Sequence, residues 1–582
     1  MKHATIGAHK HTIAALLMAL LGTYACKGAS LEVGRPDASM DADAPADVAS
    51  DVGGGDTPKD TLEPEQDEAP DDEGPMQDPL TVRVSVDALR SVRDRDLLPR
   101  DPQTDIAKAR LQGSLEGLEH PTRINAYVRP DQAPPEGLCQ GQPAASVRVA
   151  PANAGSAAFT MEVPVELVLP SAPRDIVLCV AGDPTARHRV RDVIVGDIVL
   201  IAGQSNASAR LDARGQFPTD AFKADLSQRD PRIRTLMRDG RWYEATGDVM
   251  NNRCVSVDTS MCQANTEPVD VHGQPQAEFE TRAHVGQWGL RMAKVVLEQS
   301  GVPLGVINGA FPGTLIFMNL PDPSDHANPD TTYGALFERL ELRGLREHVR
   351  AIFWYQGESD ASAIRVRMYQ DSFDTLYAAW KADYPNLEQT YVFQVRQGCF
   401  GLPFNPDMLN LQELLRSMTS AAADISLIST TGISAHDGCH YPFPGGYKVI
   451  GEHAAALLML DLYGVRPADP AQTPGTPDFL GATVNGAVVS LSMRPPHPSQ
   501  GYAVDPGNEP FFRVMQGGTQ IGVSGVRVSP TDKHVLELQL SAPVSPGPLY
   551  VAYVGHSRSG PWVTVDGTGV GIPNFEVTVQ AP

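Results

Sequence analysis

The sequence predicts an α/β protein in which helices cover both faces of a parallel sheet, with a β-sandwich domain before it and another after it. Strand patterns alternate with helical patterns over residues 193–470, and this alternation is typical of parallel sheets. Residues 79–192 and 475–582 instead carry short strand patterns separated by turns rich in Pro and Gly, which favours antiparallel β-sandwiches. A chain of 582 residues is too long for one core, so three folded units are expected.

The middle section supplies the strands and helices of the predicted parallel sheet. Short apolar runs predict five strands, at residues 198–202, 304–308, 351–355, 391–395 and 425–429. Helical periodicity predicts five helices, at residues 282–299, 333–349, 365–383, 408–423 and 445–460. The irregular insert over residues 211–280 is expected to lie over a ligand site, which forms at the carboxyl ends of parallel strands. In the flanking sections strands are expected at residues 81–86, 146–149, 159–165, 176–180, 487–491 and 535–540.

Residues 1–26 are interpreted as a lipoprotein-type signal peptide. Lysines precede an apolar run over residues 13–21, which is too short to span a bilayer, and Cys26 follows a small residue just after it. This resembles a bacterial lipoprotein signal and predicts lipidation of Cys26, hence a membrane anchor. Ordinary cleavage nearby is the alternative. The expected location is the bacterial outer membrane or cell surface, and otherwise the periplasm or the medium.

Residues 27–78 are predicted to be an acidic, disordered linker. Residues 31–78 hold 16 acidic side chains against 2 basic ones and almost no large apolar residues, so this segment cannot bury a core. Calcium binding is the alternative, but no spacing of ligands recurs. The net charge of -23 and the lack of a basic stripe exclude nucleic acid as a probable class of partner.

Six cysteines remain after Cys26, an even number that predicts disulfides in an exported protein. Sequence alone leaves about fifteen pairings open. Position within the predicted domains favours the pairs Cys139–Cys179, Cys254–Cys262 and Cys399–Cys439. The last pair would hold a loop that carries candidate catalytic residues. Zinc binding by the Cys and His residues of this region is the alternative, but their spacing fits no common zinc pattern, and we expect no metal and no cofactor.

One strand end carries a candidate nucleophile. The apolar run over residues 197–202 leads directly into Gly203, Gln204, Ser205 and Asn206. A serine hydroxyl needs a base, and a neutral imidazole needs a carboxylate that fixes its tautomer and offsets the charge it gains. Far downstream, Asp437 and His440 stand three positions apart and can supply both. The chain order of serine, aspartate and histidine suits an α/β hydrolase arrangement.

Three motifs follow one another in the chain. They are Gly203-Gln204-Ser205-Asn206, Trp354-Tyr355-Gln356-Gly357-Glu358-Ser359 and Asp437-Gly438-Cys439-His440. Together they resemble the SGNH hydrolase superfamily, and within it the branch of sialate O-acetylesterases and acetylxylan-esterase-like proteins, similar to carbohydrate esterase family 6. They stand in the family's order across residues 193–463. The resemblance implies the three-layer α/β/α SGNH-hydrolase fold with a flavodoxin-like sheet.

The resemblance also implies roles for individual residues. Ser205 would be the nucleophile, His440 the general base and then acid, and Asp437 the carboxylate that orients it. The oxyanion hole would combine the backbone N–H groups of Ser205 and Gly313 with the side-chain amide of Gln356. The family usually has paired glycines where this chain has Pro312 and Gly313, and proline has no N–H to donate. Gly203, Gln204 and Asn206 would support the serine, and Glu358 would brace Gln356 or its loop.

The activity implied by the resemblance is hydrolysis of acetyl or other short acyl esters on carbohydrate, with an acetylated carbohydrate as the partner. Two alternatives stay open: a lipid or thioester hydrolase of the same superfamily, and a surface carbohydrate-binding protein with an inactive esterase fold. The sequence leaves the sugar and the oligomeric state open.

Several large or ionisable residues could have either a structural or a functional role. Trp242, Tyr243 and Trp354 would form a sugar-stacking wall or would pack in the core. His436 is expected near the site without reacting, and His284 is interpreted as an ordinary residue near a helix start.

Overall fold

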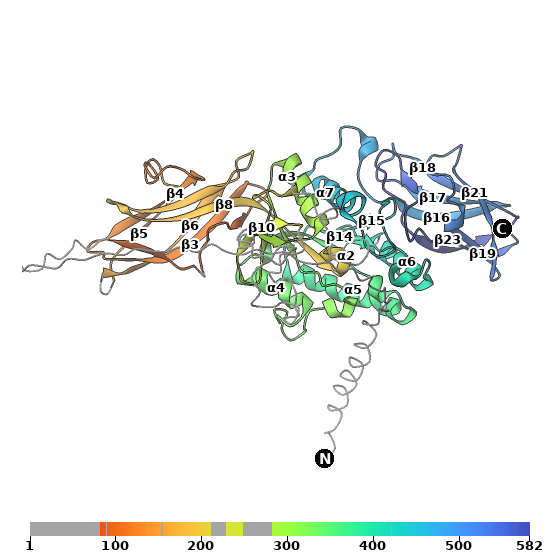
Figure 1. The fold of residues 1–582 in the computed structure, drawn as a ribbon, viewed down its shortest axis with the longest axis horizontal. Coiled ribbons are helices and arrows are strands. Elements are labelled where there is room, and N and C mark those ends of the chain that lie inside the picture. The colour runs from red at the N-terminus through yellow and green to blue at the C-terminus, as the bar shows by residue number, and fades with distance from the viewer. Residues whose placement is uncertain (1–81, 89, 153–154, 211–227, 248–281, 421) are drawn as a thin grey trace, which may run out of the picture. The chain divides into compact units, whose positions relative to one another are not determined.

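The computed structural model describes residues 82–582 except 89, 153–154, 211–227, 248–281 and 421 (Figure 1). These residues belong to one compact unit. The predicted signal peptide, the acidic linker, and Cys26, Cys254 and Cys262 lie outside the described residues. Among the described residues, no helix is long and apolar enough to cross a membrane.

The centre of the protein is a run of five parallel strands. They are β8 (Asp183–Gly203), β12 (Leu304–Asn308), β13 (Val349–Tyr355), β14 (Gln389–Gln394) and β15 (Ile425–Ser429). Their order across the sheet is β12-β8-β13-β14-β15, so the first strand along the chain lies second. This is the doubly wound order. The next of these five strands along the chain is added on one side of β8 and the later strands on the other, and such a change of side leaves a crevice at the carboxyl ends of β8 and β13.

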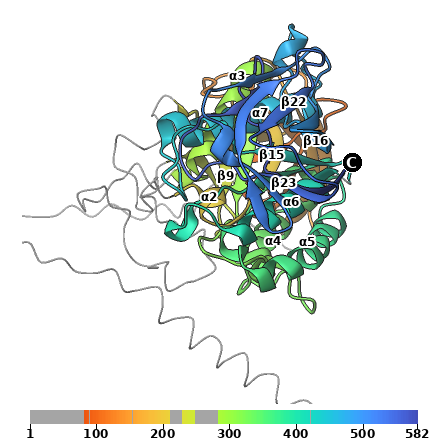
Figure 2. The same ribbon diagram turned by 90° about the vertical axis from the view of Figure 1, so that its right-hand side faces the viewer.

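Helices lie on both faces of these strands (Figures 1 and 2). On one face α3 (Gln287–Ser300) packs against α7 (Lys448–Tyr463). The other face carries α4 (Thr332–Leu342), α5 (Ala363–Asp383) and α6 (Pro406–Ser420). Fully buried apolar side chains of the strands, such as Val199 and Ile352, fill the space between sheet and helices. This is why the strands show as unbroken apolar runs in the sequence.

One expected helix begins later than its sequence pattern indicated. Residues 282–284 form the strand β11 (Arg282–His284), which pairs in parallel with β10 (Trp242–Thr246) at the edge of the sheet. β10 in turn pairs with β9 (Arg234–Leu236). Gly286, with φ of 91°, separates β11 from helix α3, so the prediction of a helix from residue 282 was wrong over its first five positions. Tertiary pairing overrides helical periodicity here.

The section before the parallel strands consists of two sheets around one apolar core. β8 joins it to the central sheet without a linker, because its first half pairs antiparallel with β7 and its second half pairs parallel with β12 and β13. The strands of this section are β1 (Arg83–Val86), β2 (Leu97–Pro99), β3 (Ile106–Glu116), β4 (Thr122–Pro130), β5 (Ala145–Val149), β6 (Ala157–Glu166) and β7 (Arg174–Val180).

The section after α7 has its own core between two four-stranded antiparallel sheets and a third pair of strands. One sheet has the order β16-β17-β22-β21 and the other the order β20-β19-β23-β25. Their bounds are β16 (Asp478–Asn485), β17 (Val488–Arg494), β18 (Tyr502–Val504), β19 (Phe512–Gln516), β20 (Thr519–Ile521), β21 (Val523–Val528), β22 (Val535–Leu540), β23 (Gly547–Tyr553), β24 (Val563–Val565) and β25 (Phe575–Ala581). We refer to residues 478–581 as the C-terminal β unit.

Short helical turns occupy the loops at the strand ends. They are α2 (Ser205–Ser208), η4 (Ile316–Asn319), η5 (Arg346–His348), η6 (Glu358–Asp360), η7 (Cys399–Gly401), η8 (Phe443–Tyr447), η9 (Pro470–Gln472) and η10 (Glu509–Phe511).

Candidate active site

The candidate nucleophile lies on a tight turn at the carboxyl end of β8. Gly203 adopts φ of 130°, and a Cβ there would lie 2.1 Å from the carbonyl oxygen of Tyr355 on the neighbouring strand, so only glycine fits. Ser205 follows as the first residue of α2 and is 7% exposed. The strand end therefore delivers the hydroxyl to the crevice at the carboxyl edge of the sheet.

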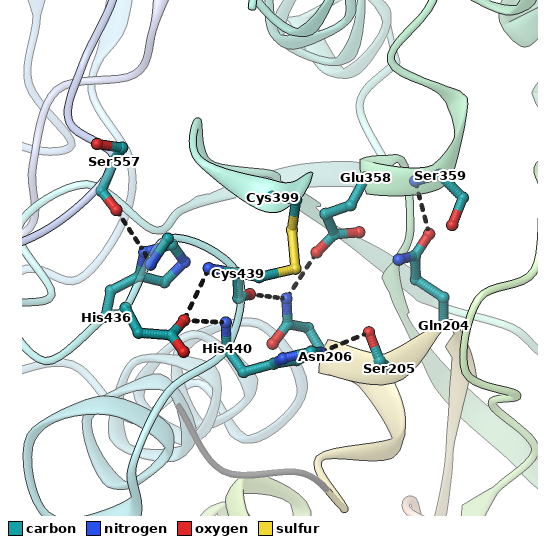
Figure 3. The surroundings of a disulfide bond; sticks show 12 residues. Gln204, Ser205, Asn206, Glu358, Ser359, Cys399, His436, Cys439, His440 and Ser557 are labelled. Carbon is teal, nitrogen blue, oxygen red and sulfur yellow. Dashed lines mark hydrogen bonds between the residues drawn. A yellow bond between two sulfur atoms is a disulfide. The ribbon is translucent and has the colours of Figure 1, made fainter. Parts of the chain in front are cut away.

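The structure brings Ser205 and His440 together. The Nε2 atom of His440 lies 3.0 Å from the Oγ atom of Ser205, within hydrogen-bonding distance (Figure 3). His440 lies on the irregular loop between β15 and η8, and its side chain is largely buried beside the serine. A serine hydroxyl in contact with an imidazole is the arrangement that nucleophilic catalysis by serine requires.

Asp437 lies on the same loop and contacts its backbone. Its Oδ1 atom accepts the N–H of Cys439 at 2.9 Å and the N–H of His440 at 3.1 Å. Gly438, between them, has φ of 117° and allows the sharp turn. These contacts fix the conformation of the loop, whereas a role of the Asp437 carboxylate toward the imidazole ring stays a prediction.

A disulfide joins the loop to η7, the helical turn that follows β14. Cys399 and Cys439 are bonded, with their Cα atoms 4.4 Å apart, and Cys139 and Cys179 form a second bond in the N-terminal section. Two of the three predicted pairs are thus confirmed, and the third lies outside the described residues. Because the sulfurs of Cys399 and Cys439 bond to each other, neither is available as a thiolate for the alternative zinc site.

Asn206 joins the turn of Ser205 to the loop of His440. Its Nδ2 atom donates to the carbonyl oxygen of Cys439 at 2.8 Å and to Oε1 of Glu358 at 2.7 Å (Figure 3). Its Oδ1 atom accepts the hydroxyl of Tyr447 at 2.9 Å. The two polar atoms of the Asn206 side chain thus make three hydrogen bonds in a buried site, and these bonds fix its geometry.

Glu358 is a fully buried carboxyl group beside this junction. Burial raises the pKa of Glu358 to about 7, and the hydrogen bond from Asn206 opposes part of that rise. Its Oε2 atom has no hydrogen-bond partner among the residues that the structure describes. The expectation that Glu358 braces Gln356 is corrected in one respect, because its side chain holds Asn206 instead.

The partner of Gln356 is Asp360, a residue that the sequence analysis did not single out. Nε2 of Gln356 donates to Oδ2 of Asp360 at 2.6 Å and to the carbonyl oxygen of Thr314 at 3.0 Å. Asp360 also accepts the N–H of Ile316 at 2.9 Å. Both amide protons of Gln356 thus have protein acceptors, and the residue holds the turn that contains Gly313. Its role as a direct oxyanion donor stays a prediction.

Gly313 lies on the turn after β12, and Gln204 directly precedes the serine. Gly313 is exposed on its turn with φ of 78°. Oε1 of Gln204 lies 3.3 Å from Nε2 of Gln356, 3.5 Å from the N–H of Gly357 and 3.3 Å from the N–H of Ser359. These donors fix the orientation of the Gln204 amide, and Figure 3 shows its nitrogen on the side of Ser205 and Glu358.

The aromatic residues proposed as a sugar-stacking wall belong to the core. Trp242, Tyr243 and Trp354 are at most 4% exposed, and Nε1 of Trp354 donates to the hydroxyl of Tyr369 at 3.2 Å. Each lies on a strand that is covered by other elements, so its ring has no open face for a sugar. The stacking hypothesis was wrong and the core alternative is correct.

The two further histidines, His436 and His284, are buried and contact backbone groups. We refer to residues 430–442, which carry His440, as the catalytic loop. His436 is buried in it with Nδ1 3.1 Å from the carbonyl oxygen of Ser557, and burial lowers the pKa of its ring well below the ordinary value. His284 ends β11, three residues before helix α3 begins; burial lowers the pKa of its ring to about 3, and Nδ1 accepts the N–H of Gly286.

The doubly wound sheet and the polar site at its carboxyl edge place the protein among α/β enzymes of the hydrolase type. Residues 195–458 match the family model described as carbohydrate esterase, sialic acid-specific acetylesterase. The protein is therefore a carboxylic ester hydrolase, similar to sialate O-acetylesterases. A comparison with curated protein sequences gives no match.

Three solved structures are similar to this chain, one of them with a TM-score above 0.5. A carbohydrate acetylesterase from Xanthomonas citri is 17% identical, with a TM-score of 0.54 over 85% of this chain and 99% of its own. A protein from Arabidopsis thaliana is 19% identical, with a TM-score of 0.32 over 45% of this chain and 98% of its own. The protein NanS is 15% identical, with a TM-score of 0.29 over 41% of this chain and 79% of its own. At such identities the likeness to the Xanthomonas enzyme concerns the fold.

Proposed function

We propose that the protein removes acetyl groups from carbohydrate through an acyl-enzyme intermediate on Ser205. The observation that carries the proposal is the 3.0 Å contact between Oγ of Ser205 and Nε2 of His440 in a domain of an acetylesterase family. The intact serine and histidine argue against an inactive binding protein, and the family match favours acetyl esters over lipids or thioesters.

The proposed reaction has two symmetrical halves. Oγ of Ser205 attacks the carbonyl carbon of the acetyl ester while Nε2 of His440 takes its proton. His440 then gives that proton to the sugar oxygen as its bond to the carbonyl carbon breaks, which leaves acetyl-Ser205. In the second half His440 takes a proton from water, the resulting hydroxide equivalent attacks the acetyl group, and acetate leaves as Ser205 regains its proton. Asp437 would stabilise the imidazolium that forms in each half.

Each tetrahedral intermediate carries an oxyanion that needs fixed donors. The backbone N–H groups of Ser205 and Gly313 are the first candidates. The side-chain amide of Gln356 is the third, and it would have to give up its bond to Thr314 or to Asp360 in order to donate. The amide of Gln204 is a further candidate, because its oxygen is held by other donors and its nitrogen lies on the side of Ser205.

The surroundings of the enzyme are part of the proposal. Two disulfides are typical of proteins outside the reducing cytoplasm, and they support export to the cell surface or periplasm. Anchoring through a lipid on Cys26 remains the expected attachment. We interpret the N-terminal section and the C-terminal β unit as β-sandwich domains that flank the catalytic domain.

Acetate release from acetylated xylan, pectin, sialosides and peptidoglycan tests the proposal. The wild-type protein should release acetate from at least one of them, and Ser205→Ala should release none above background. A preference for long acyl chains over acetyl on model esters would favour the lipid hydrolase. Equal acetate release by Ser205→Ala would exclude Ser205 as the nucleophile, and no release by either protein would favour the carbohydrate-binding alternative.

A further inference from the structure

A buried arginine lies where the catalytic loop meets the C-terminal β unit. Arg396 follows β14 and is 4% exposed. Its Nη1 atom donates to the carbonyl oxygen of Ile433 on the catalytic loop at 2.8 Å. Its Nε and Nη2 atoms each lie 3.3 Å from the carbonyl oxygen of His556, and Nη2 also donates to the carbonyl oxygen of Arg558. One guanidinium thus binds backbone on both sides of the junction.

Aromatic rings hold the same guanidinium on two sides. Its carbon atom lies 5.9 Å from the ring centre of Tyr441, the residue after His440, and 5.2 Å from the ring centre of Trp562 in the C-terminal β unit. Planar stacking and a fork of donors are properties of arginine that lysine lacks. The orientation of the Arg396 guanidinium is therefore fixed, and a lysine would supply the charge without this orientation.

The backbone of the C-terminal β unit also contacts the loop directly. Nδ1 of His436 lies 3.1 Å from the carbonyl oxygen of Ser557, and the hydroxyl of Ser559 donates to the carbonyl oxygen of Ser434. At Gly398 a Cβ would lie 2.7 Å from the carbonyl oxygen of Gly438 and 2.8 Å from the Cβ atom of Ser557. Gly398, the loop and the segment around residue 557 therefore lie in close contact.

The loop has little structure of its own to place His440. Residues 430–442 contain no helix or strand, although every residue of this stretch is described. Its position depends on the disulfide of Cys439, on Asn206, and on the contacts with Arg396 and the C-terminal β unit. A displacement of about 1 Å at a reacting group can lower the rate about 100-fold.

We propose that Arg396 is a positioning residue and that the C-terminal β unit is part of the catalytic apparatus, because together they hold the loop of His440 against Ser205. The inference rests on the proposed function, because the proposed function makes His440 on that loop the general base. It differs from the role of a carbohydrate-binding module, which would act on the substrate and leave the chemistry of the serine unchanged.

The test uses a small acetyl ester, p-nitrophenyl acetate, which needs no polysaccharide-binding surface. Arg396→Lys keeps the charge and removes the planar fork, and it should lower kcat about 10- to 100-fold with KM within about twofold of the wild type. The rate at which a fluorophosphonate labels Ser205 should fall in parallel, because labelling also requires His440.

Arg416→Lys is the matched control. Nη1 of Arg416 donates to the carbonyl oxygen of Phe479 in β16 at 3.3 Å, and its guanidinium lies 5.7 Å from the Phe479 ring centre, so it joins the same two parts of the chain through α6 and not through the loop. This variant should keep kcat and the labelling rate. Thermal unfolding of both variants shows how much stability each has lost.

If Arg396→Lys fails to fold, Ser559→Ala provides the second variant, since it removes one hydrogen bond to the loop from an exposed residue. It should lower kcat about two- to fivefold with unchanged KM. Wild-type kcat in Arg396→Lys and Ser559→Ala would overturn the inference, as would a loss of kcat in Arg416→Lys equal to that in Arg396→Lys. A loss of activity that appears only as a higher KM on polymers would also overturn it. Persistent activity in Ser205→Ala would instead refute the proposed function, which separates the two outcomes.

Discussion

The side-chain amide of Asn206 donates to the carbonyl oxygen of Cys439 at 2.8 Å, across 233 positions of sequence. This bond connects the turn that carries Ser205 with the loop that carries His440. The distance between nucleophile and base is therefore set by a buried amide beside them as well as by the two residues themselves. The consequence is that a residue without chemistry of its own should control the rate.

Asn206→Asp should lower kcat on acetyl esters about 100-fold or more. Aspartate has the shape of asparagine but donates no hydrogen bond, and its charge would face the carbonyl of Cys439 and the carboxyl of Glu358. Steady-state kinetics on p-nitrophenyl acetate measures the effect. Asn386→Asp, whose Nδ2 donates to the carbonyl of Glu347 far from the site, is the control and should keep wild-type kcat. Normal kcat in Asn206→Asp would contradict this role.

Substitution of Asp437 separates its two possible roles. Asn at position 437 keeps an acceptor for the N–H groups of Cys439 and His440 and loses only the charge, whereas Ala loses both. If the carboxylate stabilises the imidazolium, Asp437→Asn and Asp437→Ala should both lower kcat about 1,000- to 10,000-fold. If Asp437 only shapes the loop, Asp437→Asn would retain activity, and that result would remove it from the catalytic triad.

Reduction of the Cys399–Cys439 disulfide should lower kcat about tenfold. The bond restrains the loop of His440, and its loss gives the base more positions away from Ser205. Cys399→Ser with Cys439→Ser imitates the reduced state without reductant. The pair Cys139→Ser and Cys179→Ser, which opens the disulfide of the N-terminal section, is the control and should change stability but not kcat. Full activity with thiol titration showing an open Cys399–Cys439 bond would disprove the restraint.

The carboxyl of Glu358 should make stability depend on pH. Its pKa is about 7 in the folded protein against 4.5 as the ordinary value, so the folded protein retains a proton that the unfolded chain releases in this range. The stabilisation is complete below pH 4.5 and is lost as the pH rises through 7. The free energy of unfolding should thus fall by about 3 kcal/mol from this group.

Glu358→Gln removes this titration, so its stability should fall less between pH 4.5 and pH 8 than that of the wild type. Urea unfolding at several pH values measures the difference. Burial raises the pKa of Asp96 to about 6, but Asp96 is present in both proteins and its contribution cancels. Parallel pH profiles for the two proteins would show that Glu358 does not titrate in this range.

The sequence was informative where one physical signal determines the structure. The strands β8, β12, β13, β14 and β15 are buried on both faces and therefore appear as short apolar runs. Because parallel strands end at one edge, the motif of Ser205 after β8 and the motif of Gln356 after β13 had to lie close together. The pairing of Cys399 with Cys439, which position within the predicted domains favoured, is also confirmed.

Other features depend on contacts that leave no local pattern. Asp360 was overlooked because a carboxylate two residues after Glu358 looks like any polar loop residue until its contact with Gln356 is seen. Trp242 and Trp354 were uncertain, since the sequence does not show what covers a ring. The hydrogen bonds of Arg396 to the C-terminal β unit join residues more than 160 positions apart, and no periodic pattern in the sequence predicts such contacts.

Covalent labelling of the intact protein with a fluorophosphonate tests the central claim most directly. Mass spectrometry of the digested protein should place one adduct on Ser205. The adduct should be absent in Ser205→Ala, and it should form at least about 100-fold more slowly in His440→Ala, where no base takes the proton. An adduct on another residue, or labelling of His440→Ala at the wild-type rate, would contradict the assignment of Ser205 as nucleophile and His440 as its base.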